Sequence, residues 1–351
     1  MTRFRQAVRP GTVYSLAVAV VAAFTATGNA QQLTKIRFQL DWRFEGPAAL
    51  FLLPAAKGYF KQEGLDVTID GGNGSAGAVN RVASGTYDMG FADMSALIEF
   101  LASNRDNPGA RMQAVYMLYD ETPAAVFVLK SSGITKPSDL MGKTIGAPIF
   151  DAGRKTFPLF VKANKLDPNR IKWQSMDAPL RETMLARRQV DAIIGFYFTS
   201  LLNLNARGVK DDEIVVFKYA DHGVRLYGNA VLANQKFIDR HPAAIGAFLR
   251  ALTKGVREVL ADPDGAIKYV KQRDPLIDEA LERRRLRLAI DTVIATPAVK
   301  ANGIGAADRQ KLQATVAQVV EAFNLDSRPS ADALFNSTFL PVASERLIHV
   351  K

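Results

Sequence analysis

The stretch from residue 36 to residue 70 constrains the fold more than any other part of the chain. Hydrophobic and polar residues alternate over 36–40, which is the period of a strand with one buried face. An apolar helix is predicted over 48–57, and a second strand is predicted around 67–69. A strand–helix–strand unit of this kind is parallel and right-handed, so the sequence predicts an α/β fold.

Two residues set the limits of the helix in this unit. Pro47 can occupy the first helical turn, where its missing N–H is not needed, and Gly58 is suited to a left-handed helix end. Ligands of open α/β sheets bind beyond the carboxyl ends of the strands. The residues at the end of the first strand are Asp41, Trp42, Phe44 and Glu45. We therefore expect this loop to form one wall of a binding cleft.

The first thirty residues have the pattern of an export signal. Three arginines precede an apolar run over 13–24, and small residues at 28–30 offer a cleavage site. The run is shorter than the ~20 apolar residues of a membrane-spanning helix, although an uncleaved anchor is the alternative. Since the chain has no cysteine, no lipid can be attached after cleavage. The sequence predicts a signal peptide over 1–30 and a protein of the Gram-negative periplasm that is not a lipoprotein.

The remaining length and charge limit the function. The formal charge of the whole chain is +10, and the segment left after cleavage is long enough for about two domains. The only dense basic cluster, at 283–287, lies in a stretch with the pattern of an amphipathic helix. A solvated helix face explains the cluster better than a nucleic-acid site, so we predict no nucleic-acid partner.

A glycine-rich turn follows the second predicted strand. Gly72, Gly74 and Gly77 match the G-x-G-x-x-G pattern of dinucleotide-binding proteins, but that pattern normally follows the first strand of the unit. Its N–H groups could hold an anion or an electronegative ligand atom. The alternative is a tight turn in which Ser75 only caps a helix.

The second half of the chain repeats the first in outline. Strands are predicted over 88–93, 143–147 and 190–197, and Asp88 and Asp191 each stand between a helix end and an apolar strand. Further helices are predicted over 238–260, 277–294 and 306–323, with a break at Pro263.

Catalytic patterns are scarce. The three histidines have no metal-binding spacing, and Ser75 lacks a complete nucleophile elbow, because Asn73 stands where the first glycine should be. We predict a protein that is not an enzyme and that needs no cofactor and no metal.

Several motifs together resemble the periplasmic binding-protein family of ABC importers. They are Asp41-Trp42, Gly58-Tyr59-Phe60, residues 63–67 (EGLDV), Gly85-x-x-Asp88 and Asp139-Leu140-x-Gly142-Lys143. The resemblance is to the branch that contains thiamine-pyrimidine-precursor, nitrate, taurine and alkanesulfonate binders. It implies an α/β fold of type II, with two doubly wound lobes joined by a two-crossing hinge. Eukaryotic relatives in this branch make the thiamine pyrimidine at a cysteine-rich iron site, which a chain without cysteine does not have.

The resemblance also implies a domain plan and partners. Lobe 1 would contain residues 31–122 and 229–351, and lobe 2 would contain 123–228, with hinge crossings near 121–123 and 225–229. The protein would act as a monomer that delivers its ligand to an ABC permease and its ATPase. A periplasmic enzyme on the same scaffold and a signalling receptor are the other function classes.

Strand ends and helix starts supply the candidate ligand-binding residues. They are Asp41, Trp42, Phe44, Glu45, Gly74, Ser75, Ala92, Asp93, Tyr119, Glu121, Asp151, Gly153, Arg154, Asp177, Phe196 and Tyr197. Acids outnumber bases in this set and several members are aromatic, which favours a small nitrogen heteroaromatic such as an aminopyrimidine. Nitrate, taurine or an alkanesulfonate is the alternative ligand. Ala48 stands where pyrimidine-precursor binders tend to have a histidine, so the choice of ligand stays open.

Overall fold

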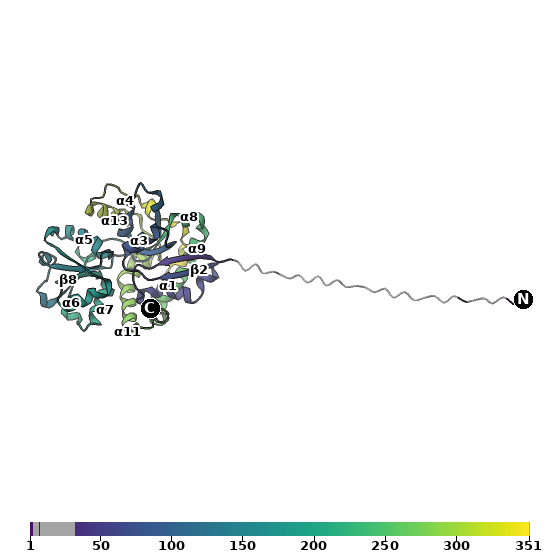
Figure 1. Cartoon of the computed structure of the whole chain (residues 1–351), viewed down its shortest axis with the longest axis horizontal. Coiled ribbons are helices and arrows are strands. Elements are labelled where there is room, and N and C mark those ends of the chain that lie inside the picture. The colour runs from purple at the N-terminus through teal and green to yellow at the C-terminus, as the bar shows by residue number, and fades with distance from the viewer. Residues whose placement is uncertain (3–6, 8–31, 351) are drawn as a thin grey trace. The chain divides into compact units, whose positions relative to one another are not determined.

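The structure is a computed structural model that describes residues 1, 2, 7 and 32–350 (Figure 1). Nearly all of the predicted signal peptide, residues 1–30, therefore lies outside the described residues. Within the described residues, no helix is both long enough and apolar enough to cross a membrane. The compact unit that begins at Leu33 contains every helix and strand described below.

Within residues 32–350, ten strands form two mixed sheets of five strands each. The first sheet contains β1 (Thr34–Gln39), β2 (Leu65–Asp70), β3 (Met89–Asp93), β4 (Met112–Met117) and β10 (Asn229–Asn234), in the order β2-β1-β3-β10-β4. The second contains β5 (Ala124–Leu129), β6 (Thr144–Ala147), β7 (Lys172–Ser175), β8 (Ala192–Phe196) and β9 (Ile214–Lys218), in the order β7-β6-β8-β5-β9. The fourth strand in each order, β10 or β5, is antiparallel to both of its neighbours.

The two sheets also share a local device at equivalent places. Asp88 precedes β3, and its side chain accepts a hydrogen bond of 2.8 Å from the N–H of Arg37 in β1. Asp191 precedes β8, and its side chain accepts a hydrogen bond of 2.8 Å from the N–H of Thr144 in β6. The predicted echo between the two halves is thus confirmed, because each aspartate ties the start of the central strand of its sheet, β3 or β8, to the neighbouring parallel strand, β1 or β6.

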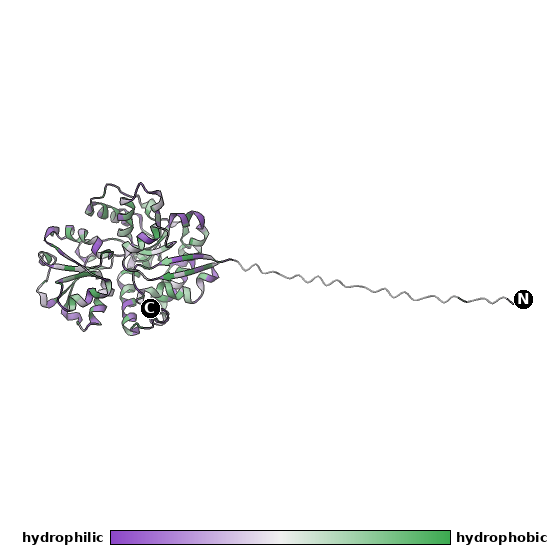
Figure 2. Ribbon diagram, viewed as in Figure 1, coloured by the Kyte–Doolittle hydropathy of each residue, from purple (hydrophilic) through white to green (hydrophobic). Residues whose placement is uncertain are grey.

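The helices cover both sheets. They are α1 (Ala49–Ala56), α2 (Tyr59–Gln62), α3 (Ser75–Ala83), α4 (Met94–Ser103), α5 (Ala152–Ala163), α6 (Arg181–Ala186), α7 (Tyr197–Asn205), α8 (Gln235–Arg240), α9 (Pro242–Ala261), α10 (Pro263–Arg273), α11 (Glu279–Ala289), α12 (Pro297–Asn302), α13 (Arg309–Ala322), α14 (Ala331–Leu334) and α15 (Ala343–Arg346). Hydrophobic residues gather on the strands and the inner faces of these helices, and hydrophilic residues lie mainly toward the outside (Figure 2).

The predicted strand–helix–strand unit is confirmed. β1 pairs with β2 in parallel along its whole length, and Phe38 of β1 packs against the rings of Phe51 and Phe248 at 5.1 and 5.2 Å. Pro47 lies in the 3₁₀ turn η1 (Gly46–Ala48) that precedes α1. Gly58 has a φ of 72° just after α1, which is the left-handed conformation that glycine adopts without strain.

The chain passes between the two sheets twice, after β4 and after β9. We call the elements on the first sheet lobe 1 and those on the second sheet lobe 2. Figure 1 shows α5, α6 and α7 around β8 in lobe 2, and α1 and α9 beside β2 in lobe 1, where α8 packs on α9 and β10. The residue boundaries predicted for the lobes stay predictions.

Two C-terminal helices contact both lobes, because α11 packs on η1 and α7, and α13 packs on α4 and α5.

Of two sequence predictions for the C-terminal half, one was wrong and one is confirmed. The helix predicted over 238–260 is two helices, α8 and α9, with the break at His241 and Pro242. The predicted break at Pro263 is confirmed, because α9 ends at Ala261 and Pro263 begins α10, with Asp262 accepting a hydrogen bond from the N–H of Gly265 at 3.0 Å. In both places a proline stands in the first turn of the new helix, where it removes no needed hydrogen bond.

Candidate functional site

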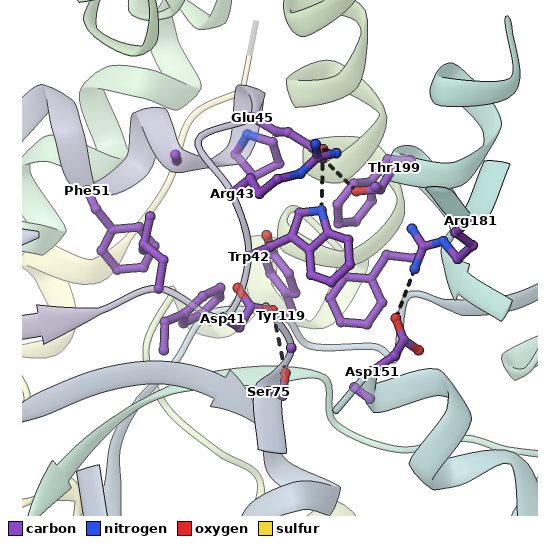
Figure 3. A pocket seen from close by; sticks show the side chains of 18 residues that line it. Asp41, Trp42, Arg43, Glu45, Phe51, Ser75, Tyr119, Asp151, Arg181 and Thr199 are labelled. Carbon is purple, nitrogen blue, oxygen red and sulfur yellow. Dashed lines mark hydrogen bonds and ion pairs between the residues drawn. The ribbon is translucent and has the colours of Figure 1, made fainter. Parts of the chain in front are cut away.

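A cavity lies between the carboxyl end of β1 and the facing edge of lobe 2 (Figure 3). The space open to the centres of water molecules is about 50 Å³. One water needs roughly 10–15 Å³ of such space, so the cavity has room for several waters or for a compact ring. Side chains from both lobes line it, among them Asp41, Trp42 and Tyr119 from lobe 1 and Asp151, Arg181 and Phe196 from lobe 2.

The glycine-rich turn holds the loop that carries Asp41 and Trp42. The N–H of Gly72 donates to the carbonyl of Trp42 at 2.9 Å, and the N–H of Gly74 donates to the carbonyl of Asp41 at 2.7 Å. A Cβ atom on Gly72 would collide with the carbonyls of Leu40 and Asp41. These two amides are already hydrogen-bonded, so they are not free to hold an anion, and the turn is a tight turn that supports the loop. Ser75 does not cap α3, because Gly74 is the residue at that position and the Ser75 hydroxyl faces Asp41 instead.

Asp41 is the most perturbed acid in the cavity wall. Its side chain is 8% exposed, and burial raises its pKa to about 7. Hydrogen bonds to Oδ2 from the Asn229 amide (2.7 Å) and the Ser75 hydroxyl (3.5 Å) act in the opposite direction. The nearby carboxylate of Asp93, whose own pKa burial raises to about 6, raises the pKa of Asp41 further. Asp41 can therefore change protonation near neutral pH.

Glu45 connects the two lobes. One of its carboxylate oxygens accepts hydrogen bonds from the indole N–H of Trp42 (3.3 Å) and the guanidinium of Arg43 (3.2 Å). The other oxygen accepts a hydrogen bond of 3.1 Å from the hydroxyl of Thr199 in α7, and lies 3.5 Å from the guanidinium of Arg285 in α11. Glu45 thus orients Trp42 and contacts lobe 2 and α11 at the same time.

Arg285 corrects the prediction that the basic cluster at 283–287 is a solvated helix face. Its side chain is 1% exposed and pairs with Glu282 at 2.8 Å. It also donates to the carbonyls of residues 198 and 199 at the start of α7. The neighbouring Arg284 and Arg287 form surface ion pairs, as the prediction requires. The one buried member helps to join α11 to lobe 2.

Arg181 is the buried base of the lobe 2 wall. It is 1% exposed, and its guanidinium donates to Asp151 at 3.0 Å and to Glu182 at 2.8 Å. Burial opposes its charge, but Glu182 and Asp151 outweigh that effect and the pKa of Arg181 is raised. The guanidinium carbon lies 5.1 Å from the ring centre of Trp42, which is within cation–π range. Arg181 therefore meets the lobe 1 wall across the cavity.

The structure brings half of the predicted site residues together around the cavity. Those that line it are Asp41, Trp42, Glu45, Gly74, Ser75, Tyr119, Asp151 and Phe196. Those that do not are Phe44, Ala92, Asp93, Glu121, Gly153, Arg154, Asp177 and Tyr197. Whether the first group binds ligand stays a prediction.

The second group serves other contacts. Asp93 caps α4 by accepting a hydrogen bond from the N–H of Ser95 at 2.8 Å, and Glu121 pairs with Lys311 at 3.0 Å. The guanidinium of Arg154 lies 4.7 Å from the ring centre of Trp173. A position after a strand end is therefore compatible with a structural role as well as with the cavity.

Sequence reasoning missed other residues of the cavity. They are Leu40, Arg43, Pro47, Ala48, Phe51, Phe91, Ala152, Arg181, Phe198 and Thr199. Arg43, Pro47 and Ala48 lie in the loop already chosen, so the alternation that placed that loop could have found them. Nothing in the local sequence marks Arg181, because an arginine at the start of a short helix normally faces solvent.

Among the described residues, no group of three or more histidine, cysteine and acidic side chains could hold a metal ion. His222, which lies near the second crossing, packs its ring against Phe160 and Phe217 at 5.7 and 5.6 Å. This packing gives His222 a structural role.

A family model described as "NMT1/THI5 like" matches residues 48–266. The chain belongs to this family. Its matched segment includes Ala48, Arg181 and Thr199 of the cavity, but Asp41 and Trp42 precede it.

Relatives of this NMT1/THI5-like protein include both binding proteins and proteins named as enzymes. It is 25% identical over 261 residues to the formylaminopyrimidine-binding protein of Halalkalibacterium halodurans, which covers 72% of this chain and 76% of the relative. It is 27% identical over 260 residues to the 4-amino-5-hydroxymethyl-2-methylpyrimidine phosphate synthase of Aspergillus parasiticus, covering 71% and 74%. The solved structure of the alkanesulfonate-binding protein SsuA from Xanthomonas axonopodis pv. citri, bound to MOPS, matches with a TM-score of 0.67. The identity is 15%, and the match covers 87% of this chain and 99% of that one. This last likeness shows the periplasmic binding-protein fold.

Proposed function

We propose that the protein is the solute receptor of an ABC importer and that it captures a small nitrogen heteroaromatic, such as a pyrimidine vitamin precursor, in the cavity between its lobes. The observation that carries this proposal is the position of the cavity, which receives charged and aromatic side chains from both lobes. A relative named as a formylaminopyrimidine-binding protein supports the ligand class. The bound ligand would be delivered to a membrane permease and its ATPase.

The aromatic lining suits a flat ligand. Trp42, Tyr119 and Phe196 line the cavity together with Phe198, and the ring of Tyr119 meets that of Phe198 edge to face at 6.0 Å. Aromatic side chains bury a large area and favour stacked or edge-to-face contacts with a ring. Ala48, where the resemblance places a histidine, also lines the cavity, so the ligand meets a methyl group there.

Capture would take place by closure of the lobes. Contacts that cross the cleft include Thr199 to Glu45, Arg181 over Trp42, and the N–H of Ala76 to the carbonyl of Phe150 at 3.4 Å. A ligand that contacts both walls would stabilise the form in which these contacts are made, and so would shift the equilibrium between open and closed forms. Small-angle scattering tests this step, because a radius of gyration that does not change at saturating ligand would count against closure.

Thermal-shift measurements across a ligand panel test the proposed ligand class. The panel contains aminopyrimidines, related vitamins, nitrate, taurine and alkanesulfonates. We expect stabilisation by at least one ring compound and a smaller effect of the anions. Stabilisation by taurine, nitrate or a sulfonate alone would overturn the proposed ligand class while leaving the receptor role in place.

Two other functions have specific observations in their favour. Arg43 and Arg181 line the cavity, and a structural neighbour is an alkanesulfonate-binding protein, which favours an anion receptor. Relatives named as synthases favour an enzyme, although the chain has no cysteine to build an iron site of the kind that the resemblance implies for them. Incubation with the best ligand of the panel, followed by chromatography, tests the enzyme. A new product would establish turnover.

A further inference from the structure

The charged side chains that line the cavity differ in whether they are paired with an opposite charge. Five charged side chains line it: Asp41, Arg43, Glu45, Asp151 and Arg181. Glu45 pairs with Arg43 at 3.2 Å, and Asp151 pairs with Arg181 at 3.0 Å. Asp41 forms no ion pair within the described part of the chain, and its side-chain hydrogen bonds come from the neutral groups of Asn229 and Ser75. Asp41 is thus the one charged group of the lining that the protein itself does not neutralise.

We propose that Asp41 receives a nitrogen group of the ligand that donates hydrogen bonds, such as the amino group and protonated ring nitrogen of an aminopyrimidine. This inference rests on the proposed function and names the chemistry that the site selects. An oxygen of an ionised carboxyl group accepts strong, charge-assisted hydrogen bonds from such N–H donors. A ligand of this kind supplies the positive charge that the cavity lacks.

The carboxyl group is held ready for this contact. Both side-chain hydrogen bonds to Asp41, from Asn229 at 2.7 Å and from Ser75 at 3.5 Å, end on Oδ2. They fix the orientation of the group while leaving Oδ1 with accepting capacity. The backbone is fixed as well, since the N–H of Gly74 donates to the Asp41 carbonyl. Trp42, the next residue, lines the same cavity, so a ring beside Trp42 can present its edge to Asp41.

The neighbours of Asp41 favour a shared proton. Asp93 at the start of α4 is a like charge, Tyr119 at the end of the β4 strand is neutral with a raised pKa, and neither supplies a cation. On the facing lobe, the charge of Arg181 is balanced by two carboxylates. A neutral Asp41 carboxyl group can face a neutral ring, or an Asp41 carboxylate can face a protonated ring. In either form, the complex holds one proton between Asp41 and the ligand. Binding should therefore weaken at alkaline pH, where that proton is lost.

The test uses two probes that differ by one group. The first is 4-amino-5-hydroxymethyl-2-methylpyrimidine, and the second is 5-hydroxymethyl-2-methylpyrimidine, which lacks the amino group. Calorimetry on the full mature protein should give about tenfold weaker binding of the second probe, because one charge-assisted hydrogen bond is lost. The substitution Asp41→Asn should weaken the first probe by about tenfold or more and should reduce the difference between the two probes. Asp106→Asn, at an exposed ion pair with Arg105, is the control and should bind like the wild type.

The outcomes separate this inference from the proposed function. If Asp41→Asn binds the amino probe as tightly as the wild type, the inference falls and the receptor role stands. If the wild type binds no ring compound but does bind taurine or a sulfonate, the proposed ligand class falls as well. If circular dichroism shows that Asp41→Asn does not fold, two measurements on the wild type still test the inference. Equal affinity for the two probes, or affinity that stays constant between pH 6 and about 9, would overturn the inference.

Discussion

The two walls of the cavity differ in whether the protein itself neutralises their buried charged side chains. On the lobe 2 wall, Arg181 is buried between Asp151 and Glu182, so a base and two acids neutralise one another without a ligand. On the lobe 1 wall, Asp41 is also buried, but its side-chain hydrogen bonds among the described residues come from the neutral groups of Asn229 and Ser75. The difference indicates that lobe 2 supplies a rigid, self-contained surface, while lobe 1 keeps the group whose charge a ligand can satisfy.

The largest expected effect comes from breaking the neutralised wall. Arg181→Met keeps the length of the side chain but leaves Asp151 and Glu182 buried without their base. Removing one member of a buried ion-pair group costs about 3–5 kcal/mol of unfolding free energy. Urea unfolding measures the loss. Arg187→Met, an exposed position just after the same helix, is the control and should change stability by less than about 0.5 kcal/mol. Similar losses for both variants would contradict the assignment of Arg181 as a buried charge partner.

Asp41 on the lobe 1 wall should make the free energy of unfolding fall as the pH rises, which is opposite in sense to the effect of an ordinary surface acid. Since burial raises the pKa of Asp41 from the ordinary 3.8 to about 7 in the folded protein, the folded state binds the proton more tightly than the unfolded state. Stability from this group is full below pH 4 and is lost as the pH rises toward and through 7. Asp93, whose pKa burial raises to about 6, adds to the same decline.

Removing the acid should remove part of that decline. The unfolding free energy of the wild type should fall between pH 5 and pH 8, and for Asp41→Asn this fall should be smaller by roughly 2 kcal/mol. Thermal unfolding at several pH values checks the effect, with Asp106→Asn as a control that should follow the wild type. A variant whose stability declines with pH as steeply as that of the wild type would show that Asp41 titrates normally.

The two tryptophans offer a matched pair for the ring contact. Trp42 lies under Arg181 inside the cavity, and Trp173 lies under Arg154 on lobe 2, outside it. Trp42→Ala should weaken binding of the best ring compound by more than ~1 kcal/mol if the side chain contacts the ring. Trp173→Ala removes a similar cation–π pair and should leave the affinity unchanged. Equal losses in calorimetry would remove Trp42 from the ligand site.

The smallest expected effect concerns the contact that joins the walls. Thr199→Val keeps the shape of the side chain but removes its hydrogen bond to Glu45, so the closed form loses about 1 kcal/mol. The affinity for the ring compound should fall by about fivefold. Thr183→Val, which loses a hydrogen bond with Arg207 away from the cavity, should leave it unchanged. If Thr199→Val binds as tightly as the wild type, this contact does not contribute to closure.

Local patterns were enough for the parts of the fold that depend on neighbouring residues. Alternation predicted β1 and β2, and Pro47 and Gly58 marked the limits of the helix between them because each has a conformational preference of its own. The matched positions of Asp88 and Asp191 indicated two similar sheets. The strand β10 was missed, since its partners β3 and β4 lie more than a hundred residues earlier in the chain.

The residues of the candidate site also fall into two groups: those that local sequence patterns could predict and those that only the tertiary structure places. The end of β1 could be recognised from the sequence because parallel strands place their carboxyl ends at one edge of the sheet, and this rule found Asp41 and Trp42. Arg181 and Arg285 look like surface residues in the sequence, and only the tertiary structure buries them. The reason is physical, because the burial of a charge depends on partners brought together by packing. Glu45 stands more than two hundred residues before Glu282 and Arg285 in the chain.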